Sequence, residues 1–274
     1  MINQIYPCLW FDGQAKAAAD FYCSIFKNSK VTMASPMVVN FELDGKKFMG
    51  LNGGPMFKFT PAISIFATFE TVEETNKVWT KLFEGGKALM SIDKYDWSER
   101  YGWLQDKFGL TWQISVVNPT AKPQIKPSML FVNEKFGQAQ EAINFYTSVF
   151  EDSAIDLLVP YPETSNVMYS EFNLKKHDFI AMDGPGKHEY TFNEAFSIVV
   201  DCQSQEEIDN YWNQLTSDGG QESQCGWLKD KFGVSWQIIP TIIGSLMSDP
   251  TRGQRVMQQI MQMKKMDIEK LINA

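Results

Sequence analysis

The sequence predicts an α+β protein built from two tandem copies of one domain. The stretch from Trp103 to Gln113 recurs almost unchanged from Trp227 to Gln237. In both halves, short runs rich in β-branched and aromatic residues alternate with segments whose apolar residues recur at helical spacing. With 274 residues, the chain is long enough for two domains of about 120–130 residues each. We therefore expect two similar mixed domains in succession.

The first half predicts a βαβββ unit followed by a second unit that also begins with a strand and a helix. The expected strands are residues 7–11, 38–43, 47–51 and 63–69, and the expected helices are residues 15–26 and 72–83. Asp44-Gly45 is a two-residue signal for a tight hairpin between the second and third strands. Thr71, followed three residues later by Glu74, is a capping-box pattern and predicts the start of the second helix.

The repeated stretch predicts a turn that leads into a strand. Asp106 can accept backbone N–H groups of the turn, and Gly109 can adopt a positive φ. In the strand that follows, alternation places Trp112 on one face and Gln113 on the other. The Gln is then either an exposed amide opposite a buried indole or a buried functional amide.

A proline-punctuated linker, residues 121–127, separates the two copies. The expected domains are therefore residues 1–120 and 128–245. In the first copy, the loop before the repeated stretch, residues 87–101, is longer than its counterpart in the second. Its aromatic and charged side chains could determine specificity or could simply pack on the surface.

The tail, residues 246–274, predicts a C-terminal helix. Asp249 can cap the helix and Pro250 can occupy its first turn. A Met-rich apolar stripe continues to about Leu271. We expect this helix to dock on a domain or on a second subunit, so a homodimer is one option.

Composition restricts the kinds of partner. The formal net charge is −8 without clustered Lys and Arg, which argues against binding to nucleic acid or to an anionic membrane. No run of about 20 apolar residues could span a bilayer, and the N-terminus does not resemble a signal peptide. Four cysteines without CxxC spacing suggest free thiols. We expect a cytoplasmic protein with a small-molecule ligand.

Four segments carry a family resemblance. They are residues 8–13, 48–54, 225–238 and 258–267. As a set they resemble the PhnB-like branch of the vicinal oxygen chelate superfamily, which also includes glyoxalase and the extradiol dioxygenases. Many members of the branch are named 3-demethylubiquinone-9 3-methyltransferase. The resemblance implies tandem domains of paired βαβββ modules, with each pair curling an eight-stranded sheet around a cleft.

The resemblance also implies positions for a metal site. Metal-using relatives carry Glu on the last strand, where this chain has Gln113 and Gln237, and commonly His where it has Ser64 and Ser197. Gln and Ser are a poor donor set for a divalent ion, which usually needs carboxylates or imidazoles. We therefore predict no cofactor and no metal site. Asp183 could restore weak divalent binding in the second domain, or it could be a turn residue.

The remaining candidate site is the concave face of each expected sheet. Its residues are Gln113, Ser64, Trp10, Phe66, Gln237 and Ser197, and Asp183 is a further pocket candidate. Aromatic walls with a few amides and hydroxyls describe a small-molecule pocket, and they equally describe a filled core with paired amides.

Three functions are compatible with such a site. The first is a metal-independent enzyme acting on a small aromatic or carbonyl compound, for which the resemblance implies lyase, isomerase or dioxygenase chemistry. The second is a protein that sequesters such a ligand, and the third is a structural or assembly role. Methyl transfer is not expected, because residues 52–55 do not lead into the helix that an S-adenosylmethionine-binding loop requires.

Overall fold

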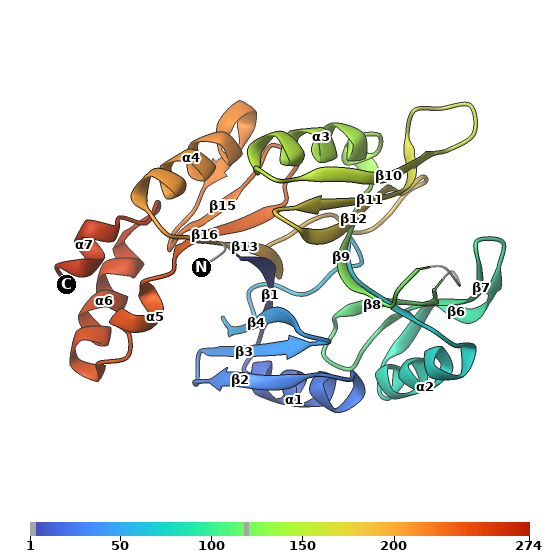
Figure 1. Ribbon diagram of the computed structural model, residues 1–274, viewed down its shortest axis with the longest axis horizontal. Coiled ribbons are helices and arrows are strands. Elements are labelled where there is room, and N and C mark those ends of the chain that lie inside the picture. The colour runs from blue at the N-terminus through green and yellow to red at the C-terminus, as the bar shows by residue number, and fades with distance from the viewer. Residues whose placement is uncertain (1–3, 118–120) are drawn as a thin grey trace.

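The computed structural model describes residues 4–117 and 121–274, which form an α+β protein (Figure 1). The strands of the first half are β1 (Ile5–Phe11), β2 (Lys30–Ala34), β3 (Val38–Leu43), β4 (Lys46–Asn52), β5 (Ile63–Phe69), β6 (Lys87–Tyr95), β7 (Ser98–Gln105) and β8 (Thr111–Val116). Those of the second half are β9 (Ile125–Phe131), β10 (Ala154–Pro160), β11 (Val167–Leu174), β12 (His177–Asp183), β13 (Phe196–Cys202), β14 (Gln221–Glu222), β15 (Trp227–Lys229) and β16 (Ser235–Pro240). The predicted fold class is confirmed.

The helices lie outside the sheets. They are α1 (Ala15–Ile25), α2 (Val72–Phe83), α3 (Ala139–Val149), α4 (Gln205–Leu215), α5 (Ile243–Leu246), α6 (Pro250–Gln262) and α7 (Ile268–Ile272), with short 3₁₀ turns at Asn133–Lys135 and Ser217–Gly219. Helices α1 and α2 lie along one side of the molecule, and α3 and α4 lie along the opposite side (Figure 1). The predicted capping box is present, because the Thr71 side chain accepts a hydrogen bond from the Glu74 backbone N–H.

Two eight-stranded sheets each combine strands from both halves of the chain. Sheet A has the order β14-β15-β16-β13-β1-β4-β3-β2, and sheet B has the order β10-β11-β12-β9-β5-β8-β7-β6. The chain therefore contains four βαβββ modules, which we number 1 (residues 5–52), 2 (63–116), 3 (125–183) and 4 (196–240). Modules 1 and 4 share sheet A, and modules 2 and 3 share sheet B.

This pairing corrects the expectation that the two modules of each half would share a sheet. The first strands of the modules meet in antiparallel pairs, with Cys8 opposite Ser197 in sheet A and Ser64 opposite Ser128 in sheet B. Each sheet thus draws on both of the expected domains, 1–120 and 128–245. A strand with alternating apolar and polar residues can pair equally well with a strand of its own half or of the other half. The sequence pattern alone could therefore not distinguish sheets within each half from sheets shared between the halves.

A buried carboxylate connects the two modules within the first half. Asp106 Oδ2 accepts hydrogen bonds from the Tyr22 hydroxyl on α1, at 2.7 Å, and from the Trp112 indole N–H, at 2.9 Å. Asp106 Oδ1 accepts the backbone N–H groups of Phe108 and Leu110. The side chain is therefore both the cap of the predicted turn and the link between α1 of module 1 and β8 of module 2.

The second half repeats this carboxylate arrangement closely. Asp230 Oδ2 accepts hydrogen bonds from Tyr146, at 2.7 Å, and from the Trp236 indole, at 2.8 Å. Asp230 Oδ1 accepts the backbone N–H groups of Phe232 and Val234. Sheet pairing joins modules 1 to 4 and 2 to 3, and these carboxylates join modules 1 to 2 and 3 to 4. The four modules therefore form a closed ring.

The predicted linker is too long. Strand β9 begins at Ile125, and Pro127 lies inside it, opposite Ile65 of β5. A Pro cannot donate to a sheet ladder and normally argues against a central strand, which is why the sequence suggested a linker here. Residues 118–120, at the end of the expected first domain, lie outside the described residues.

The predicted loop at residues 87–101 is a β-hairpin made of β6 and β7. Its register shifts three times between Ala88 and Tyr95, which disturbs the alternation that would have predicted strands. Trp97 lies at the hairpin turn and is 65% exposed. The second half keeps only the two-residue strand β14 at the corresponding place.

The tail contains two helices, α6 and α7, and not one, and the short helix α5 precedes them. The predicted cap is confirmed, since the Asp249 carboxylate accepts the backbone N–H groups of Thr251 and Arg252. Helix α6 ends at Gln262, and the backbone that follows accepts hydrogen bonds from Cys225 and Gly226 in the loop before β15. The tail thus docks on the second half. It lies beside the segment that leads into β15, as β6 lies beside β7 in the first half. Among the described residues, no helix is long and apolar enough to cross a bilayer.

We predict that Asp230→Asn lowers the free energy of unfolding at neutral pH by about 2–3 kcal/mol. The amide replaces one acceptor oxygen with a donor, so a buried N–H group of the turn or of Trp236 loses its partner. Asp106→Asn should cost a similar amount, whereas Asp218→Asn on the surface should change stability by less than about 0.5 kcal/mol. Denaturant unfolding measures all three, and an unchanged midpoint for both buried variants would refute the carboxylate link.

The same carboxylate predicts a pH dependence of stability. Burial raises the pKa of Asp230 from 3.8 to about 6, although hydrogen bonds from Trp236 and Tyr146 oppose the shift. A folded-state pKa above the unfolded one means that this group stabilises the fold most below pH 3.8, and that the contribution is lost as the pH rises through about 6. The difference in unfolding free energy between wild type and Asp230→Asn should therefore shrink between about pH 4 and pH 7. If the difference in unfolding free energy stays constant over that pH range, the raised pKa of Asp230 is contradicted.

Candidate functional site

One face of sheet B carries a polar and aromatic surface. The side chains of Ile65, Trp112, Ile114 and Met129 point into the hydrophobic core. The alternate side chains form the opposite face, which we call the sheet B face; it consists of Ser64, Phe66, Tyr101, Trp103, Gln113, Lys126, Ser128, Tyr169 and Glu171. Alternation along central strands therefore separates an apolar interior from a polar surface within one sheet.

Gln113 occupies the middle of a hydrogen-bonded network on this face. The Tyr101 hydroxyl donates to Gln113 Oε1 at 2.9 Å, and Gln113 Nε2 donates to the Ser128 hydroxyl at 3.3 Å. The Ser64 hydroxyl accepts the Trp103 indole N–H at 3.2 Å and the Thr111 hydroxyl at 3.1 Å. Gln113 is only 4% exposed. Gln113 is thus a buried amide that is held by Tyr101 of module 2 and by Ser128 of module 3.

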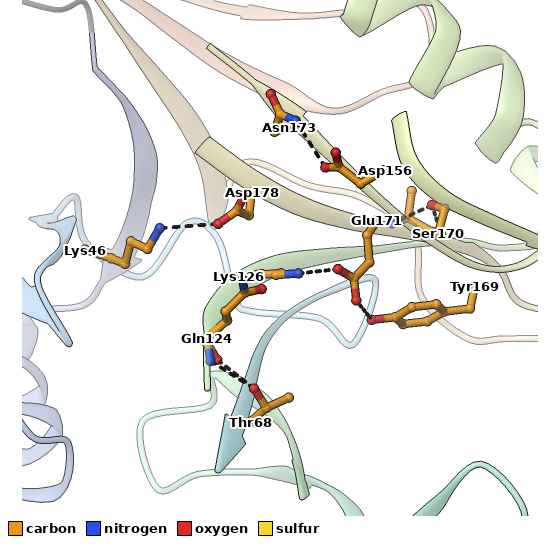
Figure 2. Close-up of polar contacts among 11 residues, drawn as sticks. Lys46, Thr68, Gln124, Lys126, Asp156, Tyr169, Ser170, Glu171, Asn173 and Asp178 are labelled. Carbon is orange, nitrogen blue, oxygen red and sulfur yellow. Dashed lines mark hydrogen bonds and ion pairs between the residues drawn. The ribbon is translucent and has the colours of Figure 1, made fainter. Parts of the chain in front are cut away.

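A charged cluster lies on the same face (Figure 2). The Lys126 ammonium donates to Glu171 Oε2 at 2.6 Å, and the Tyr169 hydroxyl donates to Glu171 Oε1 at 2.6 Å. Lys126 is 6% exposed, whereas the Glu171 side chain is 33% exposed. Lys126 comes from β9, and the other two residues come from β11. The cluster therefore places a nearly buried cation beside a carboxylate that solvent can still reach.

The environment fixes the protonation states of this cluster. Burial acts to raise the pKa of Glu171, but the hydrogen bonds from Lys126 and Tyr169 outweigh it and hold the pKa below its usual value of 4.5. Burial, together with the hydrogen bond to Glu171 and its charge, raises the pKa of Tyr169 well above its ordinary value. Burial likewise raises the pKa of Tyr101. At neutral pH the carboxylate is ionised and both phenols are neutral.

Aromatic rings surround the polar groups. Phe66 lies 6.3 Å from Tyr101 and 6.4 Å from Tyr169, measured between ring centroids. Phe66, Trp103 and Tyr169 remain partly exposed although their strands lie within the sheet. The centre of the sheet B face is therefore not completely covered by the rest of the chain.

The β6–β7 hairpin extends this aromatic surface. The rings of Tyr95 and Trp97 stack with their centroids 5.0 Å apart, and both contact Tyr101 edge to face. Tyr101 in turn holds the Gln113 amide. Tyr101 thus connects the stacked rings of the hairpin, which distinguishes the first half, to the Gln113 amide of the candidate site.

Sheet A has a corresponding face with different chemistry. Gln237 Nε2 donates to the Ser197 hydroxyl at 2.9 Å, and burial raises the pKa of the neighbouring Cys8 thiol to about 12 against the effect of hydrogen bonds from these two residues. Trp10 lies edge to face with Trp227, and its indole N–H donates to the Gly54 carbonyl. Trp10 of module 1 therefore lies in the same sheet as Gln237 of module 4, because these two modules share sheet A.

Asp183 lies apart from both faces. Its carboxylate accepts the backbone N–H groups of Gly137, Ala139 and Val167. In the first half, Asn52 likewise accepts the N–H of Ala15, the first residue of α1. These hydrogen bonds support the turn interpretation of Asp183.

The sequence reasoning missed Lys126, Tyr169 and Glu171. Lys126 alternates with the core residues Ile125 and Met129, but its neighbour Pro127 made the segment look like a linker. Tyr169 and Glu171 also alternate with buried residues of β11, and that signal was available. Their proximity to Gln113 depends on the pairing of β9 with β5, which no local pattern predicts.

The side chains at the family's metal positions do not fit a divalent ion. The oxygen atoms of Gln113 and Ser64 already accept hydrogen bonds from neighbouring side chains. On sheet A, the Gln237 amide donates to the Ser197 hydroxyl, and an amide and a hydroxyl are likewise a poor donor set for a divalent ion. Across residues 4–117 and 121–274, no three His, Cys, Asp or Glu side chains are grouped in a way that could hold a metal ion.

Two surface hollows lie away from both faces. One, of about 760 Å³, is bordered by α4 and the tail, and the other, of about 940 Å³, is bordered by α1, α2 and the segment before β9. Solvated ion pairs line them, with Lys265 bound to Asp209 and Lys27 bound to Glu74. Since exposed ion pairs of this kind are ordinary features of a protein surface, we do not assign a site to either hollow.

Solved structures show the same fold in other proteins. Glyoxalase I from Zea mays is 9% identical over 94% of this chain and 97% of its own, with a TM-score of 0.58. The V278E mutant of the same enzyme is 9% identical over 87% of this chain and 93% of its own, with a TM-score of 0.59. No curated protein matches the chain.

The sequence itself is similar to that of a named protein family. A PhnB protein from Bacillus cereus, described as a 3-demethylubiquinone-9 3-methyltransferase, is 35% identical over 40% of this chain and 96% of its own, with a TM-score of 0.38. The family model of 3-demethylubiquinone-9 3-methyltransferase matches residues 3–115 and again residues 123–239. The chain therefore belongs to this PhnB-like family, named 3-demethylubiquinone-9 3-methyltransferase, and its fold is similar to that of glyoxalase I.

Proposed function

We propose that this protein binds a small planar compound, aromatic or carbonyl, on the sheet B face and does so without a metal ion. The observation that supports this most directly is the combination of a fixed buried amide, Gln113, with partly exposed rings of Phe66, Trp103 and Tyr169 around it. Ligand sites generally consist of apolar walls with a few oriented polar groups. The hydrogen bonds to Tyr101 and Ser128 keep the amide oriented before a ligand arrives, which reduces the entropic cost of binding.

Binding fits the face better than proton-transfer catalysis. A general acid or base works best with a pKa near neutrality. The pKa of Glu171 is lowered, and those of Tyr101 and Tyr169 are raised, so each moves away from that range. The proposed role is therefore capture of a ligand.

Methyl transfer finds no support in the loop after β4. Gly53 and Gly54 lead into a turn and not into a helix, so the backbone does not form a nucleotide-binding loop. A side chain at Gly53 would collide with the Trp10 ring, which explains the glycine by packing. We therefore infer that the family name does not describe the chemistry of this face.

Sheet B is the better candidate of the two faces. Both faces carry an ion pair, Lys47–Asp201 on sheet A and Lys126–Glu171 on sheet B, but sheet A places the Cys8 thiol beside its amide, whereas partly exposed aromatic rings surround the amide of sheet B. A buried ion pair costs desolvation free energy and is weak evidence for stability, so a ligand-binding role is a reasonable explanation for its presence.

We predict that the purified protein captures a small molecule detectable by native mass spectrometry. Gln113→Ala should weaken capture by about tenfold, the effect of losing about one hydrogen bond together with the orientation it provides. Gln237→Ala, the matched change on sheet A, should leave capture unchanged. The sheet B face is not the site if the Gln113→Ala variant captures the ligand as well as the wild type does. The same conclusion follows if only the Gln237→Ala variant loses the ligand.

A further inference from the structure

The polar groups of the sheet B face have a fixed spatial order. Lys126 on β9 lies opposite Phe66 on β5, and Phe66 lies beside Gln113 on β8. Adjacent strands are about 4.8 Å apart, so the backbones of Lys126 and Gln113 are about 10 Å apart with Phe66 between them. A planar molecule lying over Phe66 therefore has an ammonium group on one side and an amide on the other.

Lys126 has unused capacity to donate hydrogen bonds. An ammonium group carries three N–H donors. Within the described part of the chain, its hydrogen bond goes to Glu171 alone. Most of the Lys126 residue is buried, but its ammonium lies 2.6 Å from Glu171, whose side chain is 33% exposed, so the group lies beside the part of the face that solvent reaches. A ligand oxygen over Phe66 could accept from one of the two remaining donors.

Glu171 determines which kind of oxygen is preferred. Its lowered pKa keeps it ionised at neutral pH, so it cancels the charge of Lys126 locally. A second carboxylate at this position would face Glu171 across a short distance, and the chain as a whole carries a net charge of −8. A neutral carbonyl oxygen accepts the same hydrogen bond without that repulsion.

We infer that the ligand is a neutral aryl carbonyl compound whose ring lies on Phe66 and whose carbonyl oxygen accepts a hydrogen bond from Lys126. This inference rests on the proposed function and specifies its ligand class. Tyr169 has a positioning role in it, since its hydroxyl holds the second oxygen of Glu171. Lys126 supplies recognition of the oxygen, and Glu171 supplies discrimination against acids.

Three probes with the same ring system test this assignment. They are 2-acetylnaphthalene, a neutral ketone; 2-naphthoate, a carboxylate; and 2-ethylnaphthalene, which has no oxygen. Titration of the full-length protein should show the ketone binding about tenfold more tightly than either of the other two. Equal affinity for the ketone and the hydrocarbon would overturn the role of Lys126.

Two variants separate recognition from discrimination. Lys126→Met should lower the affinity for 2-acetylnaphthalene about tenfold, to that of 2-ethylnaphthalene, while the hydrocarbon affinity stays the same and shows that the face is still folded. Glu171→Gln should reverse the preference, so that 2-naphthoate binds more tightly than the ketone, because the charge of Lys126 is no longer cancelled. Preference for the ketone that persists in Glu171→Gln would contradict the discrimination by charge.

The outcomes also distinguish this inference from the function on which it rests. If all three probes bind equally and Phe66→Ala weakens all of them, the sheet B face is a ligand site and the carbonyl assignment is wrong. If no probe binds the wild-type protein at concentrations up to their solubility, both the carbonyl assignment and the proposed binding of planar aromatic compounds fail.

Discussion

The buried carboxylate of the repeated stretch is the interaction on which the rest of the architecture depends. Asp106 and Asp230 each accept two side-chain and two backbone hydrogen bonds, and each thereby joins a helix of one module to the last strand of the next. Since each half is held together in this way, the first strands of its modules remain available to pair with the other half. The ring of four modules closes through β1 with β13 and through β5 with β9.

This ring explains why each face combines residues from distant parts of the sequence. Gln113 and Phe66 come from the first half, whereas Lys126, Tyr169 and Glu171 come from the second. Sheet A is built by the same rule from Cys8, Trp10, Ser197 and Gln237, and it carries its own ion pair, Lys47–Asp201. The two faces therefore occupy equivalent positions, and they differ in the aromatic and thiol side chains around their amides.

The sequence predicted those features that depend on neighbouring residues. The turn at Asp106, the cap at Thr71 and the alternation of Trp112 with Gln113 follow from local chemistry, and the structure contains each of them. Module pairing depends on contacts between segments far apart in the chain, and its local signals are equally compatible with either arrangement. Pro127 concealed Lys126 because a central strand rarely contains Pro, and Asp183 was ambiguous because a carboxylate beside a turn can cap a helix or bind a ligand.

The central claim is that a planar carbonyl compound lies over Phe66 on a face that both halves build. A crystal structure of the full-length protein soaked with 2-acetylnaphthalene tests it most directly. The account predicts density for the ring on Phe66, with the carbonyl oxygen within hydrogen-bonding distance of the Lys126 ammonium. Density between Trp10 and Trp227 on sheet A, with the sheet B face empty, would contradict it.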